Sequence, residues 1–165
     1  MQPGVPVVTR PGSFPLRLRA EDAEDLAVIS ACLQDALIAV GDFAYDPDAR
    51  VFLLAANRFR WEDCCPGATD GGRFERTLCA VTFDNITAAA YRGFQRSEKD
   101  RILCLLAIQA TVDSASASRG VIIDLDFAGD TGIRLSASAL RVRARDFGAP
   151  WPTPWQPGHE QPVSG

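Results

Sequence analysis

The sequence predicts a mainly β fold in the mixed α+β class, with a bent antiparallel sheet or small barrel of about seven strands and an N-terminal helix. Three observations predict it. One early segment has the three- and four-residue spacing of an amphipathic helix. Most of the chain after it alternates apolar and polar residues in short runs. The gaps between these runs are too short for crossover helices, so neighbouring strands should be antiparallel.

Composition bounds the chain to an ordinary globular domain. It has 165 residues, of which 47% are hydrophobic and 23% charged. The net charge of -4 repels phosphate backbones and anionic lipid, so we expect neither nucleic acid nor a membrane surface as partner. No apolar run approaches the ~20 residues of a membrane-spanning helix.

Prolines mark the expected domain boundaries. Residues 1–15 contain four prolines and are expected to form a flexible leader. Residues 16–148 should form a single β-rich domain. Residues 149–165, rich in proline and tryptophan, should form an extended C-terminal tail.

The first elements are a short strand and the helix. Alternation of Leu16 and Leu18 with arginines predicts the strand. The helix is expected from about residue 20 to residue 34, with four carboxylates near its N-terminus. Its apolar stripe should contain four residues: Leu26, Ile29, Leu33 and Leu37.

Two strand pairs are expected next. Residues 36–45 and 50–62 flank Asp46-Pro47-Asp48-Ala49, which is typical of a hairpin turn. Residues 64–73 are rich in glycine and should form an exposed loop. Residues 76–83 and 86–94 should pair around Asp84-Asn85 as a second hairpin.

The remaining strands complete the predicted sheet. Residues 102–112 form one strand, and residues 121–127 form a hairpin with 133–137, which would place Arg134 opposite an aspartate. Residues 138–147 fit both a strand and a helical stripe, and we favour the strand. A pleckstrin-homology-like barrel is one shape that satisfies this element order.

Cysteine and histidine usage argues against metal and redox chemistry. Five cysteines, three of them in apolar periodic segments, are typical of reduced core thiols in a cytoplasmic protein. Cys64 and Cys65 are adjacent and lack the spacing of a zinc site. The single histidine, His159, lies in the tail, away from any nucleophile. We therefore expect no metal, no cofactor and no catalytic residue.

Five residues are candidates for ligand binding. Arg58, Arg60 and Trp61 alternate with Phe59 on a strand, so that guanidinium groups suited to an anion would share one face. The alternative, which we favour, is that these arginines face solvent and the aromatic rings face the core. Asp124 and Arg134 complete the set as a cross-strand pair.

Four further residues are candidates for protein interaction. Arg141 and Arg143 lie on a basic stripe that could equally be an ordinary solvent-facing strand. Trp151 and Trp155, in the proline-rich tail, could dock on another protein or fold back on their own domain.

Four segments carry a resemblance to a known family: EDAEDLAVISACLQDA (21–36), VGDFAY (40–45), ANRFRWE (56–62) and FAGDTGIRL (127–135). They resemble a small bacterial family described as a domain of unknown function, DUF2948, over about Leu16 to Trp151. The resemblance implies a bacterial, cytoplasmic, single-domain protein. It implies no activity, cofactor or catalytic residue.

We therefore interpret the chain as a non-enzymatic binding or protein-interaction module for a protein partner or a small anionic ligand. The alternative is a small-molecule-binding protein or an enzyme with a pocket lined by arginine and aspartate. An exposed apolar patch would favour the first and a deep pocket the second. A homo-oligomer is compatible with both.

Overall fold

The computed structural model describes residues 14–63 and 74–154. Its strands and helices follow the predicted order. They are β1 (Arg17–Ala20), α1 (Ala23–Cys32), β2 (Leu37–Ala39), η1 (Val40–Asp42), β3 (Phe43–Asp46), β4 (Val51–Phe59), η2 (Trp61–Asp63), β5 (Phe74–Phe83), β6 (Ile86–Arg92), β7 (Ile102–Val112), β8 (Val121–Phe127), β9 (Thr131–Ala137) and β10 (Val142–Thr153). The mainly β class is confirmed.

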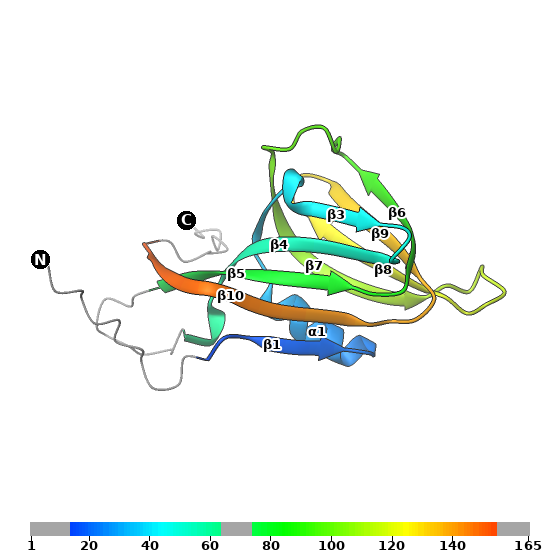
Figure 1. Ribbon diagram of the computed structural model, residues 1–165, viewed down its shortest axis with the longest axis horizontal. Helices are drawn as coiled ribbons and strands as arrows, with labels where there is room; N and C mark the ends of the chain where they lie inside the picture. The colour runs from blue at the N-terminus through cyan, green and yellow to red at the C-terminus, as the bar shows by residue number, and fades with distance from the viewer. Residues whose placement is uncertain (1–13, 64–73, 155–165) are drawn as a thin grey trace, which may run out of the picture.

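The strands form one antiparallel sheet in the order β1-β10-β5-β4-β2-β7-β8-β9-β6, with β3 added beside β4. The described part contains ten strands, so the prediction of about seven was low. The sheet is strongly bent (Figure 1). Its two end strands, β1 and β6, do not pair with each other, so the sheet is not closed into a barrel. One core cluster fills the bend with residues from both halves of the sheet.

Helix α1 is shorter than predicted. Asp22 caps it, because its carboxylate accepts a hydrogen bond from the backbone N–H of Asp25 at 2.8 Å. Leu26 and Ile29 are buried, and the helix packs against β7 and β1. Leu37, predicted on the helical stripe, instead lies in β2 and is exposed. None of the described helices has the length and apolar character needed to cross a membrane.

The first predicted hairpin is confirmed. β3 and β4 pair from Phe43 opposite Leu54 to Asp46 opposite Val51. The Asp46 carboxylate accepts hydrogen bonds from the backbone N–H groups of Asp48 and Ala49, both at 3.0 Å. These hydrogen bonds from turn N–H groups to an aspartate side chain are the interaction from which the turn was predicted.

The second predicted hairpin is wrong. β5 pairs with β4 and β10, whereas β6 pairs with β9 at the far end of the sheet. Asn85, at φ 62°, turns the chain between the two halves. The N–H of Asp84 donates to Arg141 and that of Ile86 donates to Arg50, both at 2.9 Å, so the corner bonds to other elements.

Strands β7, β8 and β9 follow the prediction. β8 buries Ile123, Leu125 and Phe127 and turns its aspartates outward, and it forms the expected hairpin with β9. Segment 138–147 contributes to strand β10, as favoured, which lies between β1 and β5.

β10 continues through Thr153, past the boundary expected at residue 148. β1 starts at Arg17, which lies opposite Arg145, so the residues of β10 after Arg145 are not paired with β1. Prolines are tolerated there because an unpaired strand edge does not need their missing N–H groups. The predicted leader up to residue 13, the glycine-rich loop 64–73 and the tail from residue 155 lie outside the described residues.

Candidate functional site

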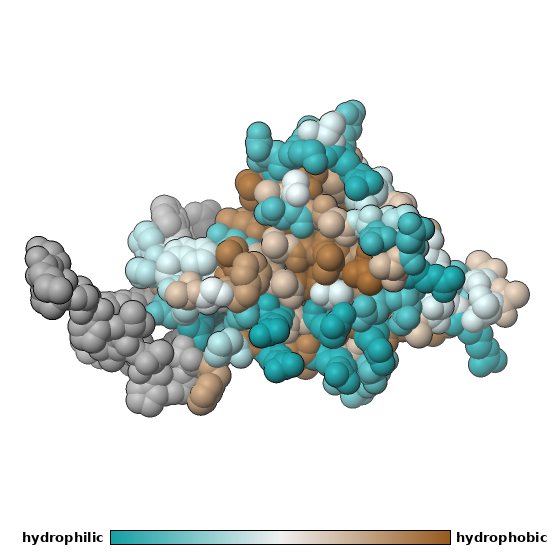
Figure 2. Space-filling model, viewed as in Figure 1, coloured by the Kyte–Doolittle hydropathy of each residue, from teal (hydrophilic) through white to brown (hydrophobic). Residues whose placement is uncertain are grey.

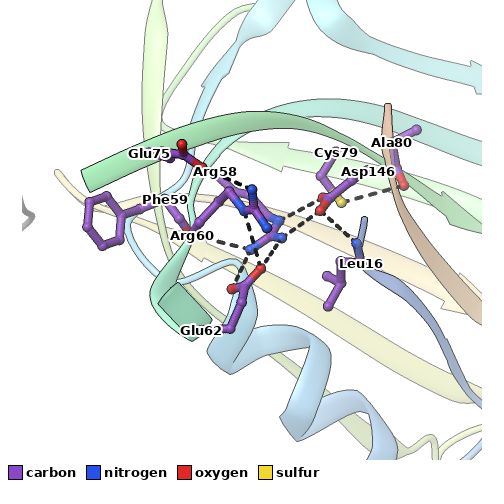
Figure 3. Close-up of polar contacts among 9 residues, drawn as sticks. All are labelled: Leu16, Arg58, Phe59, Arg60, Glu62, Glu75, Cys79, Ala80 and Asp146. Atoms are coloured by element: carbon purple, nitrogen blue, oxygen red, sulfur yellow. Dashed lines mark hydrogen bonds and ion pairs between the residues drawn. The ribbon is translucent and has the colours of Figure 1, made fainter. Parts of the chain in front are cut away.

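The structure corrects the surface prediction for Arg58 and Arg60. Their side chains are 0% and 3% exposed, although the sequence favoured a solvent-facing position. Arg58 Nε and Nη2 donate to the two carboxylate oxygens of Asp146 at 2.7 and 2.6 Å. Nη2 and Nη1 also donate to Glu62, at 2.6 and 3.0 Å (Figure 3). Arg60 Nη1 pairs with Glu75 at 3.0 Å.

This buried cluster ties separate elements together. The Asp146 carboxylate also accepts the N–H of Leu16 at 2.8 Å, and the N–H of Asp146 donates to the carbonyl of Leu16 at 2.9 Å. Burial by itself lowers the pKa of Arg58, but hydrogen bonds to Asp146 and Glu62 outweigh it and raise that pKa. We interpret Arg58 as a structural residue that joins β4, η2, β10 and the start of β1.

Glu62 makes the cluster sensitive to acid. Burial raises its pKa, but the hydrogen bonds and charge of Arg58 outweigh burial and set the pKa below the ordinary 4.5. A carboxylate with a lowered folded-state pKa stabilises the fold above its unfolded-state pKa, and this stability is lost as the pH falls through the folded-state value. The free energy of unfolding should therefore fall below about pH 4.5. Urea titrations at several pH values should show that the free energy of unfolding falls less steeply with decreasing pH in Glu62→Gln than in the unsubstituted protein. The same fall in both proteins would contradict this role of Glu62.

Burial disfavours the reactive thiolate form of the cysteine beside this cluster. Cys79 is buried beside Asp146, and burial raises the pKa of its thiol to about 12. Cys32, Cys79 and Cys104 are free thiols. Across residues 14–63 and 74–154, no three His, Cys, Asp or Glu side chains are grouped closely enough to hold a metal ion. Cys64 and Cys65 lie outside the described residues.

Asp124 and Arg134 lie in the other half of the sheet, on β8 and β9. Arg134 Nε and Nη2 donate to Asp124 at 2.7 and 3.2 Å, which is the predicted cross-strand pair. The pair lines a pocket of about 270 Å³ with Arg92 and Asp126. Arg58 and Arg60 do not line it. The structure therefore places the predicted ligand residues in two separate groups, with Arg58, Arg60 and Trp61 in one and Asp124 and Arg134 in the other.

The tryptophan candidates are used in different ways. Trp61 lies in η2, where its Nε1 donates to the carbonyl of Gln34 at 3.1 Å and its ring packs on Phe59. Trp151 is half-buried on β10, opposite Arg76. Trp155 lies outside the described residues.

Arg141 and Arg143, by contrast, line a pocket at the β1–β10 side of the sheet, which we name the arginine cleft. Its volume is about 450 Å³. Four arginines and one aspartate are among the residues that line it. The lining residues are Arg19, Ala49, Arg50, Asp84, Asn85, Arg141 and Arg143. Arg143 pairs with Asp84 at 3.1 Å and Arg141 with Glu21 at 3.5 Å, so the cleft retains excess positive charge.

Backbone geometry holds the cleft in place. Arg50 ends the β3–β4 turn at φ 57° and Asn85 forms the sheet corner at φ 62°. A left-handed conformation is common for asparagine but unfavourable for arginine. The carbonyls of Arg50 and Asn85 accept hydrogen bonds from Ile86 and Ser138, at 2.9 and 3.0 Å. Backbone strain at a cleft residue is typical of functional sites.

Two pairs of arginines extend the cleft across β1 and β10. Arg19 lies directly opposite Arg143, and Arg17 directly opposite Arg145. We name these four residues the arginine ladder. Like charges directly opposite one another destabilise a sheet. Within the described part of the chain, no carboxylate forms an ion pair with Arg17, Arg19 or Arg145. A bound anion would relieve this repulsion.

Sequence reasoning found two of the four arginines that line the cleft. It singled out Arg141 and Arg143 but not Arg19 or Arg50. The alternation of Leu16 and Leu18 with arginines did place basic groups on one face of β1. What it lacked was the pairing of β1 with β10, which lie at opposite ends of the chain.

Comparison with known proteins identifies one match. A family model described as "Protein of unknown function (DUF2948)" matches residues 16–159, which is most of the chain. No curated protein and no solved structure matches it.

Proposed function

Since the chain belongs to the DUF2948 family of proteins of unknown function, whose description assigns no activity, we propose from geometry that it is a non-enzymatic binding module. Its arginine cleft would bind a small anion that carries phosphate or carboxylate groups. The observation that carries this proposal is that four arginines and only one acidic residue are among the residues that line this cleft.

The chemistry of guanidinium favours binding over proton transfer. Arginine remains protonated in proteins, and its planar donors match the paired oxygens of phosphate and carboxylate. The cleft volume of about 450 Å³ falls within the range of small-ligand sites. Arg141 and Arg143 are each 54% exposed, so their donors are accessible from solvent.

We place this binding in the bacterial cytoplasm. The free thiols of Cys32, Cys79 and Cys104 support a reducing compartment. Metabolites that carry phosphate and carboxylate groups are the corresponding ligand class.

Thermal unfolding with pyrophosphate and citrate tests the proposal. A ligand that binds only the native state raises the unfolding midpoint, by about 2.7 kcal/mol of stability at a hundredfold excess over Kd. We expect a saturable rise of several degrees at low ionic strength, larger than in sodium chloride of equal ionic strength. Equal effects of all three salts would contradict a specific site.

Arg50→Gly is the sharpest variant, because glycine accepts φ 57° without strain. We expect it to lose most of the anion-dependent shift while the stability of the free protein stays unchanged or rises by about 1 kcal/mol. Arg92→Gln, which replaces an exposed strand arginine in the other pocket, is the matched control and should keep the full shift. If Arg50→Gly kept the full anion-dependent rise of the unfolding midpoint, the cleft would be excluded as the anion-binding site.

A further inference from the structure

The outer face of β4, β5 and β10 carries an apolar patch beside the arginine ladder. We define the patch by five residues: Leu53, Ala55, Leu78, Ala80 and Phe147. The strand register places Ala80 between Ala55 and Arg145, and Leu78 opposite Phe147. Leu53 and Phe147 are each 42% exposed. Helix α1 packs against β7 and β1, so it leaves this face uncovered.

The patch and the ladder form one continuous surface. Figure 2 shows apolar surface over the middle of β4 and β5 and hydrophilic surface below it, over β10 and β1. The boundary lies where Arg145 of β10 meets Ala80 of β5, with Arg17 beyond it. A sheet face with exposed leucine and phenylalanine normally packs on a second layer. Arg145 and Arg17 supply cationic groups along its β10 border.

We propose that this surface binds an acidic amphipathic segment of another protein. The apolar side of that segment would cover the patch, and its carboxylates would pair with Arg17 and Arg145 of the ladder. This inference adds a partner to the proposed module and stands independently of anion binding in the cleft.

The shape of the patch favours a protein segment over a lipid surface. Its centre is made of Ala55 and Ala80, both half-buried, whereas the larger Leu53 and Phe147 lie toward its ends. Small side chains allow the close approach of a helix, whereas insertion into a bilayer needs large apolar groups at the centre of the contact. Arginine and aromatic side chains are enriched where proteins contact each other.

Designed peptides test the inference on the full chain. The probe is a fluorescent amphipathic helix with leucine and alanine on one face and glutamate along its flank. One control carries lysine in place of glutamate, and another has the same composition in scrambled order. We expect the glutamate peptide to bind at least about tenfold more tightly than either control in fluorescence anisotropy. Equal affinity for all three peptides, or no binding, would overturn the proposal.

Surface variants locate the peptide. Leu53→Ser and Arg145→Gln should each weaken binding by about tenfold, and Arg92→Gln should not change it. Both substituted side chains are exposed, so circular dichroism should show native folds; Arg145→Gln alone remains informative if Leu53→Ser is unstable. Unchanged affinity in Arg145→Gln would refute the role of the ladder.

Two further measurements separate this inference from other accounts. Arg50→Gly should keep peptide binding while losing the anion shift, and Leu53→Ser should do the reverse, so either proposal can fail alone. Vesicles of phosphatidylcholine with one-third phosphatidylglycerol should not bind the protein. Vesicle binding that is lost in Leu53→Ser, without peptide binding, would assign the face to a membrane and overturn the inference.

Discussion

Asp146→Ala is expected to lower the free energy of unfolding by about 3–5 kcal/mol, because it leaves the guanidinium of Arg58 with too few partners in the protein interior. Arg58 is fully buried and loses two charge-assisted hydrogen bonds, at 2.7 and 2.6 Å. The carboxylate also holds the N–H of Leu16, which precedes β1. Because domains are stable by only about 5–15 kcal/mol, urea unfolding should show a large fall in the midpoint.

A matched control comes from the exposed pair of Asp124 with Arg134. Asp124→Ala should cost no more than about 1 kcal/mol, because exposed ion pairs contribute little. Replacing both buried partners, as in Arg58→Met with Asp146→Leu, should destabilise less than Asp146→Ala alone. Similar losses for Asp146→Ala and Asp124→Ala would contradict the buried cluster.

Phe52→Ala should destabilise the fold by about 3–5 kcal/mol. The ring of Phe52 is fully buried at the centre of the core, with centroids 6.0 Å from those of Phe43 and Phe83 and 6.5 Å from that of Tyr45. Its removal takes away packing against the rings of β3 and β5, and the surrounding rings cannot refill the space. Chemical denaturation followed by tryptophan fluorescence measures the loss.

The neighbouring residue is the control. Leu53 is adjacent in β4 but points to the outer face, so Leu53→Ala should cost less than about 1 kcal/mol. Equal losses at the two positions would mean that the register of β4 is wrong, and with it the apolar patch.

Local patterns predicted elements better than pairings. Alternation in residues 121–127 and the turn at Asp46 predicted strands and a hairpin that the structure contains. The two-residue gap at Asp84-Asn85 also resembled a hairpin turn, but both edges of β5 are occupied by β4 and β10. Competition for strand edges is a property of the whole sheet, so a local motif cannot reveal it.

The same limit explains the site. Arg58 alternates with Phe59 as a surface arginine would, and nothing near it in sequence announces that Asp146, 88 residues later, neutralises it inside the core. Arg141 and Arg143 were found because their stripe is local. Arg19 and Arg50 join them only through the pairing of β1 with β10 and the corner at Asn85.

The central claim is that the arginine cleft binds anions, and NMR of the arginine side chains tests it most directly. Titration with pyrophosphate should shift the Nε–Hε signals of Arg19, Arg50 and Arg143 along a saturable curve, while that of Arg92 on the opposite half of the sheet stays in place. Uniform small shifts of all arginine signals, or saturable shifts at Arg92 alone, would contradict the claim.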